Sequence, residues 1–245
     1  VYPNKEESEI RQLSKAFYHH FCDILLEMAV FPFKSEKAAK KRIHLTNPEL
    51  LETLYAEGKM VMAVCGHYGN WEYYSVMGFF SSYSTLAVYK PLKNPYFDRW
   101  VRRNRMRFGS AVTPMEKVYR ELFSAQKAGR QMMTLFVADQ SPMYHQIQYW
   151  TKFLGQDTPL YLGVEKLAKK FDAAVVFFHM TKPRRGRYQL EIKLICKSPA
   201  ELPGHGITDG HVQHLEKLIN DAPQFWLWSH RRWKHSYERF LKEKA

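Results

Sequence analysis

The stretch MVMAVCGHYGNWE, residues 60–72, decides the fold, because a strand, a turn and a helix start follow one another in it. Its first part, residues 60–64, is uninterrupted apolar sequence, which is typical of a strand buried on both faces of a parallel sheet. Gly66 and Gly69 permit a tight turn. The chain therefore passes from strand to helix around His67, and in open α/β sheets functional groups gather at such strand ends.

Similar apolar runs recur along the chain and are separated by segments with helical periodicity. They lie at residues 85–89, 132–137 and 173–178. This alternation predicts an α/β fold with a mixed, largely parallel central sheet flanked by helices. Residues 188–194 instead alternate apolar and polar side chains, so we expect an edge or antiparallel strand there.

The first part of the chain has the pattern of an amphipathic helix. Apolar side chains recur at three- and four-residue steps over residues 5–30, and Pro32 ends the pattern. We expect this helix to pack on the core rather than to lie on a membrane.

Composition sets limits on the fold class and on the partners. The 245 residues are 45% hydrophobic and contain no internal repeat or low-complexity linker, so we expect a single domain over residues 1–245. The formal net charge of +13 favours an anionic partner, either a nucleic acid or a lipid surface. Three widely spaced cysteines do not form a disulfide framework, which fits a reducing compartment. No apolar run is long enough to span a bilayer.

His67 and Glu72 are the candidate catalytic pair. Five residues of regular helix rotate by about 500°, so the two side chains cannot share a helix face. We therefore expect His67 to precede the helix, where the turn folds its imidazole back toward Glu72. A carboxylate beside an imidazole fixes its tautomer and stabilises the imidazolium, as a general base requires. The alternative is a structural histidine at a strand end and a solvated glutamate in the first helical turn.

A metal site has less support than the acid–base pair. No second histidine or cysteine stands at the i, i+4 spacing of a helical metal site beside His67, so we expect neither a metal nor a cofactor.

Other strand ends carry polar or basic residues. Arg107 lies in an arginine-dense segment at 98–109, and guanidinium groups suit phosphate oxygens. Asp139 and Gln140 directly follow an apolar run, and Asp139 either binds a substrate or caps a helix. Arg231 belongs to a segment in which tryptophans and basic residues alternate, which suits a membrane interface, a nucleic acid or a phosphate.

Taken together, these blocks resemble the lipid A biosynthesis acyltransferase family, the late or secondary acyltransferases of the wider lysophospholipid acyltransferase superfamily. The blocks that carry the resemblance are the His-x4-acid box from His67 to Glu72, residues 89–109, Asp139-Gln140, the stretch from Phe153 to Pro159, and residues 228–234.

The resemblance implies a glycerol-3-phosphate/lysophospholipid acyltransferase-like fold, with His67 as the general base and Glu72 as its support. It also implies an acyl-carrier-protein or CoA thioester as donor and a phosphorylated lipid, such as a lipid A precursor, as acceptor. We expect Arg107, Asp139, Gln140 and Arg231 to contact substrate.

The resemblance further implies a place in the cell and a set of partners. They are the cytoplasmic face of the inner membrane, the acyl carrier protein and the membrane surface. Because the family usually opens with a hydrophobic anchoring helix, we expect such a helix to precede residue 1.

Two other functions remain open. A lysophospholipid or aminolipid acyltransferase would use the same two residues on a different acceptor. A non-catalytic nucleic-acid-binding protein would explain the positive charge but would leave the His67–Glu72 box without a purpose, so we expect no nucleic acid.

Overall fold

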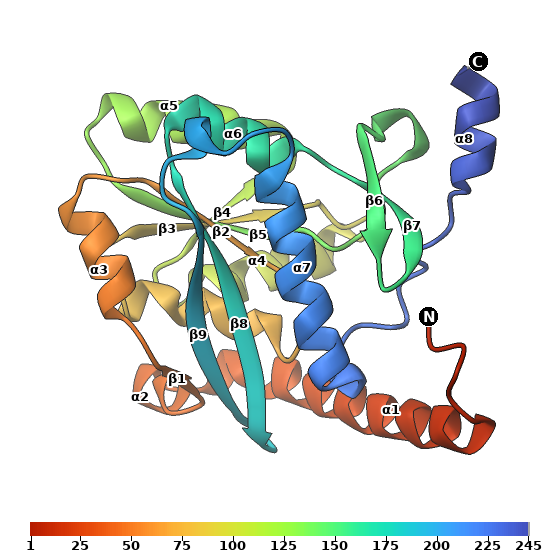
Figure 1. Cartoon of the computed structure of the whole chain (residues 1–245). Helices are drawn as coiled ribbons and strands as arrows, with labels where there is room; N and C mark the ends of the chain where they lie inside the picture. Colours follow the sequence, from red (N-terminus) through yellow and green to blue (C-terminus); the bar gives the residue numbers. More distant parts are fainter. Residues whose placement is uncertain (245) are drawn as a thin grey trace.

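A seven-stranded sheet of order β1-β9-β8-β2-β5-β3-β4 forms the centre of the computed structural model, which describes residues 1–244 (Figure 1). The strands of this sheet are β1 (Ile43–Leu45), β2 (Val61–Cys65), β3 (Ser84–Tyr89), β4 (Ala111–Pro114), β5 (Met132–Val137), β8 (Ala174–Arg184) and β9 (Arg187–Cys196). The α-helices are α1 (Glu7–Val30), α2 (Glu36–Lys40), α3 (Glu49–Ala56), α4 (Pro95–Met106), α5 (Val118–Lys127), α6 (Gly163–Phe171), α7 (Gly206–Asp221) and α8 (Tyr237–Lys244).

The sheet is mixed and mostly parallel, as the sequence predicts. The central strand β2 pairs in parallel with β5 on one side and with β8 on the other. Strand β3 pairs in parallel with β5 and with β4, whereas β8 and β9 are antiparallel. The four apolar runs correspond to β2, β3, β5 and β8, so the fold class is confirmed.

Strand β9 pairs as predicted but does not lie at the edge. It is antiparallel to β8, and its other side is covered by the short parallel strand β1. Three residues are too few for a period-two pattern to stand out in the sequence, which is why β1 is not predicted.

Both faces of the sheet are covered, and β2 contributes to both. Met62 and Val64 belong to one apolar cluster, together with Leu215 of α7. Val61 and Ala63 belong to the other cluster, to which α3 also contributes. Since successive side chains of a strand point to opposite faces, a strand buried on both sides must be apolar throughout.

Helix α1 lies along the body of the protein, as expected, with Phe17 and Ile24 buried (Figure 1). Its His20 ring contacts Phe225 with centroids 4.8 Å apart. Leu26 on its outer side is 60% exposed. Within residues 1–244, no helix is both long and apolar enough to cross a membrane.

A separate two-stranded hairpin of β6 (Tyr149–Phe153) and β7 (Gln156–Leu160) supports the end of the chain. Its turn residues Leu154 and Gly155 both have positive φ, at 51° and 75°, as a two-residue type I′ turn requires. The indole nitrogen of Trp233 donates to Thr158 Oγ1 at 2.8 Å. The hairpin is therefore hydrogen-bonded to the tryptophan-rich segment.

Candidate active site

His67 lies in the turn between β2 and the 3-10 helix η2 (Trp71–Phe79), ahead of the helix as predicted. The Asn70 side chain begins this helix by accepting a hydrogen bond from the backbone N–H of Glu72 at 3.2 Å. A Cβ atom on Gly66 would lie 2.6 Å from a Leu215 methyl and 3.1 Å from Asp139 Oδ2. Glycine at position 66 thus lets the turn approach Asp139 closely.

Asp139 is the carboxylate that holds His67. Its Oδ1 lies 2.5 Å from Nδ1 of the imidazole, and its Oδ2 accepts the backbone N–H of His67 at 2.8 Å. Oδ2 also accepts the indole N–H of Trp226 at 2.8 Å. The strand register explains why the two side chains meet. Cys65 of β2 is paired with Val137 of β5. His67 comes two residues after Cys65, and Asp139 comes two residues after Val137.

The environment keeps Asp139 ionised. Burial alone would raise the pKa of this carboxyl, but the charge and hydrogen bonds of His67 and the indole of Trp226 together hold it well below its usual value. An ionised carboxylate only accepts hydrogen bonds, so Nδ1 of His67 carries the proton that it donates to Asp139, and Nε2 is the unprotonated nitrogen of the neutral ring. The His67 side chain is 18% exposed, and an unprotonated Nε2 can act as a proton acceptor.

The predicted contact between His67 and Glu72 is wrong. Both carboxylate oxygens of Glu72 accept hydrogen bonds from Arg105, at 2.6 Å from Nη2 and 3.0 Å from Nε. The Glu72 side chain is 10% exposed and that of Arg105 24% exposed. The planar guanidinium matches a carboxylate through two parallel hydrogen bonds, so Glu72 joins η2 to α4.

Comparison with known proteins identifies the family. Residues 1–235 match the family model of bacterial lipid A biosynthesis acyltransferases. The chain belongs to this family. A lipid A biosynthesis acyltransferase of Haemophilus influenzae is 20% identical over 235 residues, which cover 93% of this chain and 70% of that relative. The resemblance inferred from the motifs is thus confirmed, and the protein is an acyltransferase.

The four residues predicted to contact substrate in this acyltransferase differ in burial and in their hydrogen-bond partners. The carboxylate oxygens of Asp139 accept hydrogen bonds from His67 and Trp226. Gln140 and Arg231 are exposed. Arg107, at the end of α4, donates from Nη2 to the carbonyl of Lys34 at 3.2 Å. Over residues 1–244, no three histidine, cysteine, aspartate or glutamate side chains are grouped to hold a metal ion.

The end of the acyltransferase chain supplies residues that the sequence analysis assigned to a surface. Trp226 is 2% exposed and Arg232 1% exposed. Nη2 of Arg232 donates to the carbonyl of Pro159 at 2.8 Å. Burial lowers the pKa of Arg232 to about 10, although the charge of Asp139 acts in the opposite direction. The tryptophan-rich segment therefore encloses Asp139, and its indoles are part of the packing.

A buried histidine predicts how stability of the acyltransferase depends on pH. His211 of α7 is 6% exposed, and burial lowers its pKa to about 4. In the unfolded chain its pKa is near 6.5. Between about pH 6.5 and 4, this imidazole is therefore protonated in the unfolded state and neutral in the folded state. We expect this group to remove roughly 2 kcal/mol of unfolding free energy between pH 7 and pH 5.

Denaturant unfolding at the two pH values measures this loss. His211→Asn should flatten the pH dependence, whereas substitution of the exposed His145 by glutamine should leave it as in the parent. Equal slopes for the parent and the His211→Asn variant would contradict the assignment.

Proposed function

We propose that the protein moves a fatty acyl chain from an acyl-carrier-protein or CoA thioester to a hydroxyl of a lipid A precursor or a related phosphorylated lipid. His67 is the general base and Asp139 its partner. The observation that supports this most is the 2.5 Å contact between His67 Nδ1 and Asp139 Oδ1 at the carboxyl edge of the sheet.

The reaction follows from the available nitrogen. Nε2 of His67 takes the proton of the acceptor hydroxyl as its oxygen attacks the thioester carbonyl carbon. Asp139 stabilises the imidazolium that forms. Collapse of the tetrahedral intermediate forms the ester, breaks the carbon–sulfur bond, and returns the proton from the imidazolium to the leaving thiolate. No covalent acyl-enzyme is required.

Glu72 has a different part in this proposal. Its ion pair with Arg105 fixes the arginine-rich helix α4 to η2, which begins three residues after Gly66-His67-Tyr68. Trp71, the neighbour of Glu72, packs edge-on against the His67 ring with centroids 5.1 Å apart. Glu72 thus acts as a positioning residue that steadies the wall beside the imidazole.

The arginines Arg107 and Arg231 are proposed to bind phosphates of the acceptor. Exposed charges contribute little to folding, whereas guanidinium groups bind phosphate strongly when they lie in a site. We therefore expect Arg107→Ala and Arg231→Ala to raise the KM for the acceptor by about tenfold while the melting temperature stays near that of the parent. A substitution of the exposed Arg120 on α5 serves as the control. An unchanged KM in both variants would show that these arginines do not bind the acceptor and are ordinary solvated side chains.

The proposed location is the cytoplasmic face of the inner membrane, with the acyl carrier protein and the membrane surface as partners. The net charge of +13 supports a negatively charged partner. A cytosolic thioester donor and a lipid acceptor would meet at that face.

One assay separates the candidate reactions. The protein is incubated with an acyl-carrier-protein thioester or with acyl-CoA, and with either a phosphorylated glucosamine lipid or a lysophospholipid, and products are identified by mass spectrometry. We expect a new ester on the phosphorylated glucosamine lipid. Ester formation on the lysophospholipid alone would change the acceptor class. Absence of transfer together with salt-dependent binding of an oligonucleotide would favour the nucleic-acid function.

A further inference from the structure

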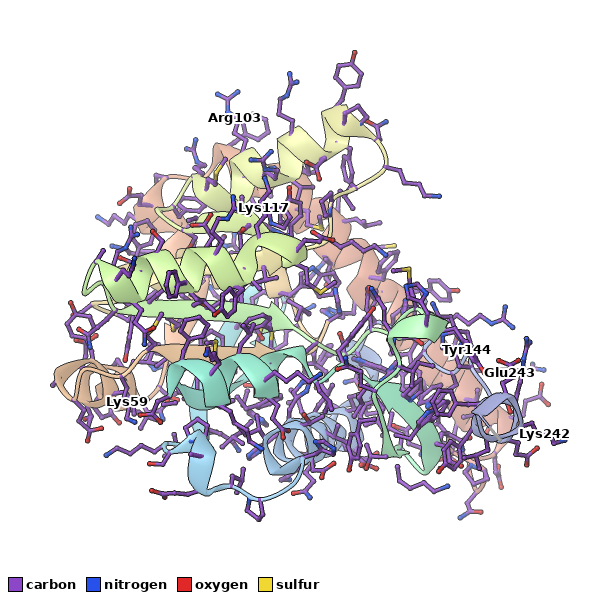
Figure 2. All side chains as sticks on the ribbon, turned by 90° about the horizontal axis from the view of Figure 1, so that it is seen from above. Lys59, Arg103, Lys117, Tyr144, Lys242 and Glu243 are labelled. Atoms are coloured by element: carbon purple, nitrogen blue, oxygen red, sulfur yellow. The ribbon has the colours of Figure 1, made fainter. Side chains whose placement is uncertain are left out.

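Helix α4 is attached to the protein by few of its side chains. Within the helix, Val101 is the buried residue, and Arg105 is directed inward to Glu72. In Figure 2 the helix runs along the upper margin of the molecule, with Arg103 labelled on its outer side. A helix of this length with one buried side chain leaves most of its surface without a partner in the chain.

Large aromatic side chains occupy the exposed part of α4. Tyr96 is 80% exposed, Phe97 50% and Trp100 37%. The rings of Phe97 and Trp100 stack on each other with centroids 5.5 Å apart and an interplanar angle of 14°. Leu92, just ahead of the helix, is 42% exposed. Together they form an apolar patch at the amino-terminal end of α4.

Exposed cations accompany this patch. Arg99, Arg102 and Arg103 are all exposed. The single acidic residue of the helix, Asp98, is engaged by the backbone N–H of Leu92 at 2.9 Å. The outer surface of α4 is therefore aromatic and positively charged.

This combination distinguishes α4 from α5, which also carries an exposed stacked pair, Tyr119 and Phe123. The Tyr119 ring rests on Phe171 of α6 at 5.4 Å, so that pair is partly packed within the protein. Glu121 also lies in the first turn of α5. Aromatic rings and arginines side by side on the exposed face of a helix are typical of helices at the boundary between lipid headgroups and acyl chains.

We propose that α4 is an interfacial helix that docks the protein on a bilayer with anionic headgroups. Phe97, Trp100 and Tyr96 enter the headgroup region, and the exposed arginines meet lipid phosphates. Binding of α4 to the bilayer does not depend on the proposed function, but the role of that binding in acyl transfer rests on it. Arg105 joins α4 to Glu72 beside the His67 turn. The docked helix therefore places the site at the bilayer that contains the lipid acceptor.

The opposite end of α4 contacts a segment that carries another exposed aromatic side chain. Arg107 donates to the carbonyl of Lys34. Phe33, the residue before Lys34, is 86% exposed. An aromatic side chain is thus available at each end of the helix, as expected for a helix lying flat on a membrane.

Co-sedimentation with phosphatidylcholine vesicles containing phosphatidylglycerol tests the docking without any chemistry. The aromatic variant is Phe97→Ser with Trp100→Ser, and the charge variant is Arg99, Arg102 and Arg103→Gln. The matched controls are Tyr119→Ser with Phe123→Ser on α5, and Lys117, Arg120 and Lys127→Gln on α5 and the residue directly before it. All these side chains are exposed, so we expect every variant to fold. Melting temperatures close to that of the parent verify this.

We expect the aromatic variant to bind vesicles about tenfold more weakly than the parent and the charge variant about a hundredfold more weakly. Binding by the charge variant should also lose most of its dependence on salt and on phosphatidylglycerol. The α5 controls should bind like the parent. Parental binding by both α4 variants, or an equal loss in the controls, would overturn the proposal.

A third outcome would assign α4 to a protein partner. If the charge variant binds vesicles like the parent but has a raised KM for the acyl-carrier-protein thioester, the helix is a docking site for the acidic carrier, and the lipid proposal fails. Acyl transfer by the parent in detergent is measured separately. Vesicle binding without transfer would contradict the proposed function alone, whereas transfer with vesicle binding that is independent of α4 would contradict the docking alone.

Discussion

Replacing His67 by alanine is expected to lower the rate of acyl transfer by about a hundred- to ten-thousandfold. The variant retains the turn glycines and the Asp139 carboxylate but lacks the nitrogen that takes the proton of the acceptor. The measurement is single-turnover transfer at saturating donor and acceptor, because product release then does not mask the chemical step.

Folding of this variant must be checked, because His67 also fills a place beside Trp71 and Asp139. Thermal unfolding gives that check, and His145→Ala provides a histidine control at an exposed position. A folded His67→Ala variant with a near-parental rate would exclude the mechanism, whatever the family membership suggests.

The position of His67 was predictable because it depends on local sequence. An apolar run, two glycines and a helix start are contiguous, so the strand–turn–helix order follows from residues 60–72 alone. The central strands were predictable for a similar reason, since strands buried on both faces have no polar positions.

The partner of His67 was not predictable from local pattern. Asp139 lies 72 residues away, and its proximity depends on the register between β2 and β5. The pairing of Cys65 with Val137 carries that information, and no periodicity in either segment reveals it. The His-x4-acid box and the position of Glu72 after a strand end favour Glu72 as the partner, but its carboxylate is paired with Arg105 of α4, another long-range contact.

The burial of the tryptophan-rich segment was likewise not predictable from its composition. Its composition indicates a surface, yet Trp226 donates its indole N–H to Asp139, and Arg232 is buried with its Nη2 on a backbone carbonyl. A tryptophan whose indole N–H has an acceptor is compatible with the interior, whereas Nε and Nη1 of the buried Arg232 have no hydrogen-bond partner within residues 1–244. Composition alone does not distinguish the two environments.

Substitution of Asp139 and of Glu72 should therefore have different consequences. Asp139→Asn keeps a side chain of the same shape but removes the charge opposite the imidazolium, and its amide N–H₂ can face Nδ1 and favour the wrong tautomer. We expect single-turnover transfer to fall by about a hundred- to ten-thousandfold. The variant should remain folded, since both hydrogen-bond donors to Oδ2 can still find the amide oxygen or relax nearby.

Glu72→Gln instead breaks the ion pair with Arg105 and leaves a largely buried guanidinium with a weaker partner. The expected result is a loss of about 1.5–3 kcal/mol in the unfolding free energy, because a hydrogen bond to a charged group contributes about that much. Single-turnover transfer by the folded fraction should fall less than in Asp139→Asn, because Nδ1 of His67 keeps its carboxylate. Arg105→Lys is the matched variant from the other side of the pair and should resemble Glu72→Gln in both measurements. If Glu72→Gln lost as much rate as Asp139→Asn while its unfolding free energy stayed parental, Glu72 would act on the imidazole during the reaction, and the assignment of Asp139 as the sole carboxylate partner would be wrong.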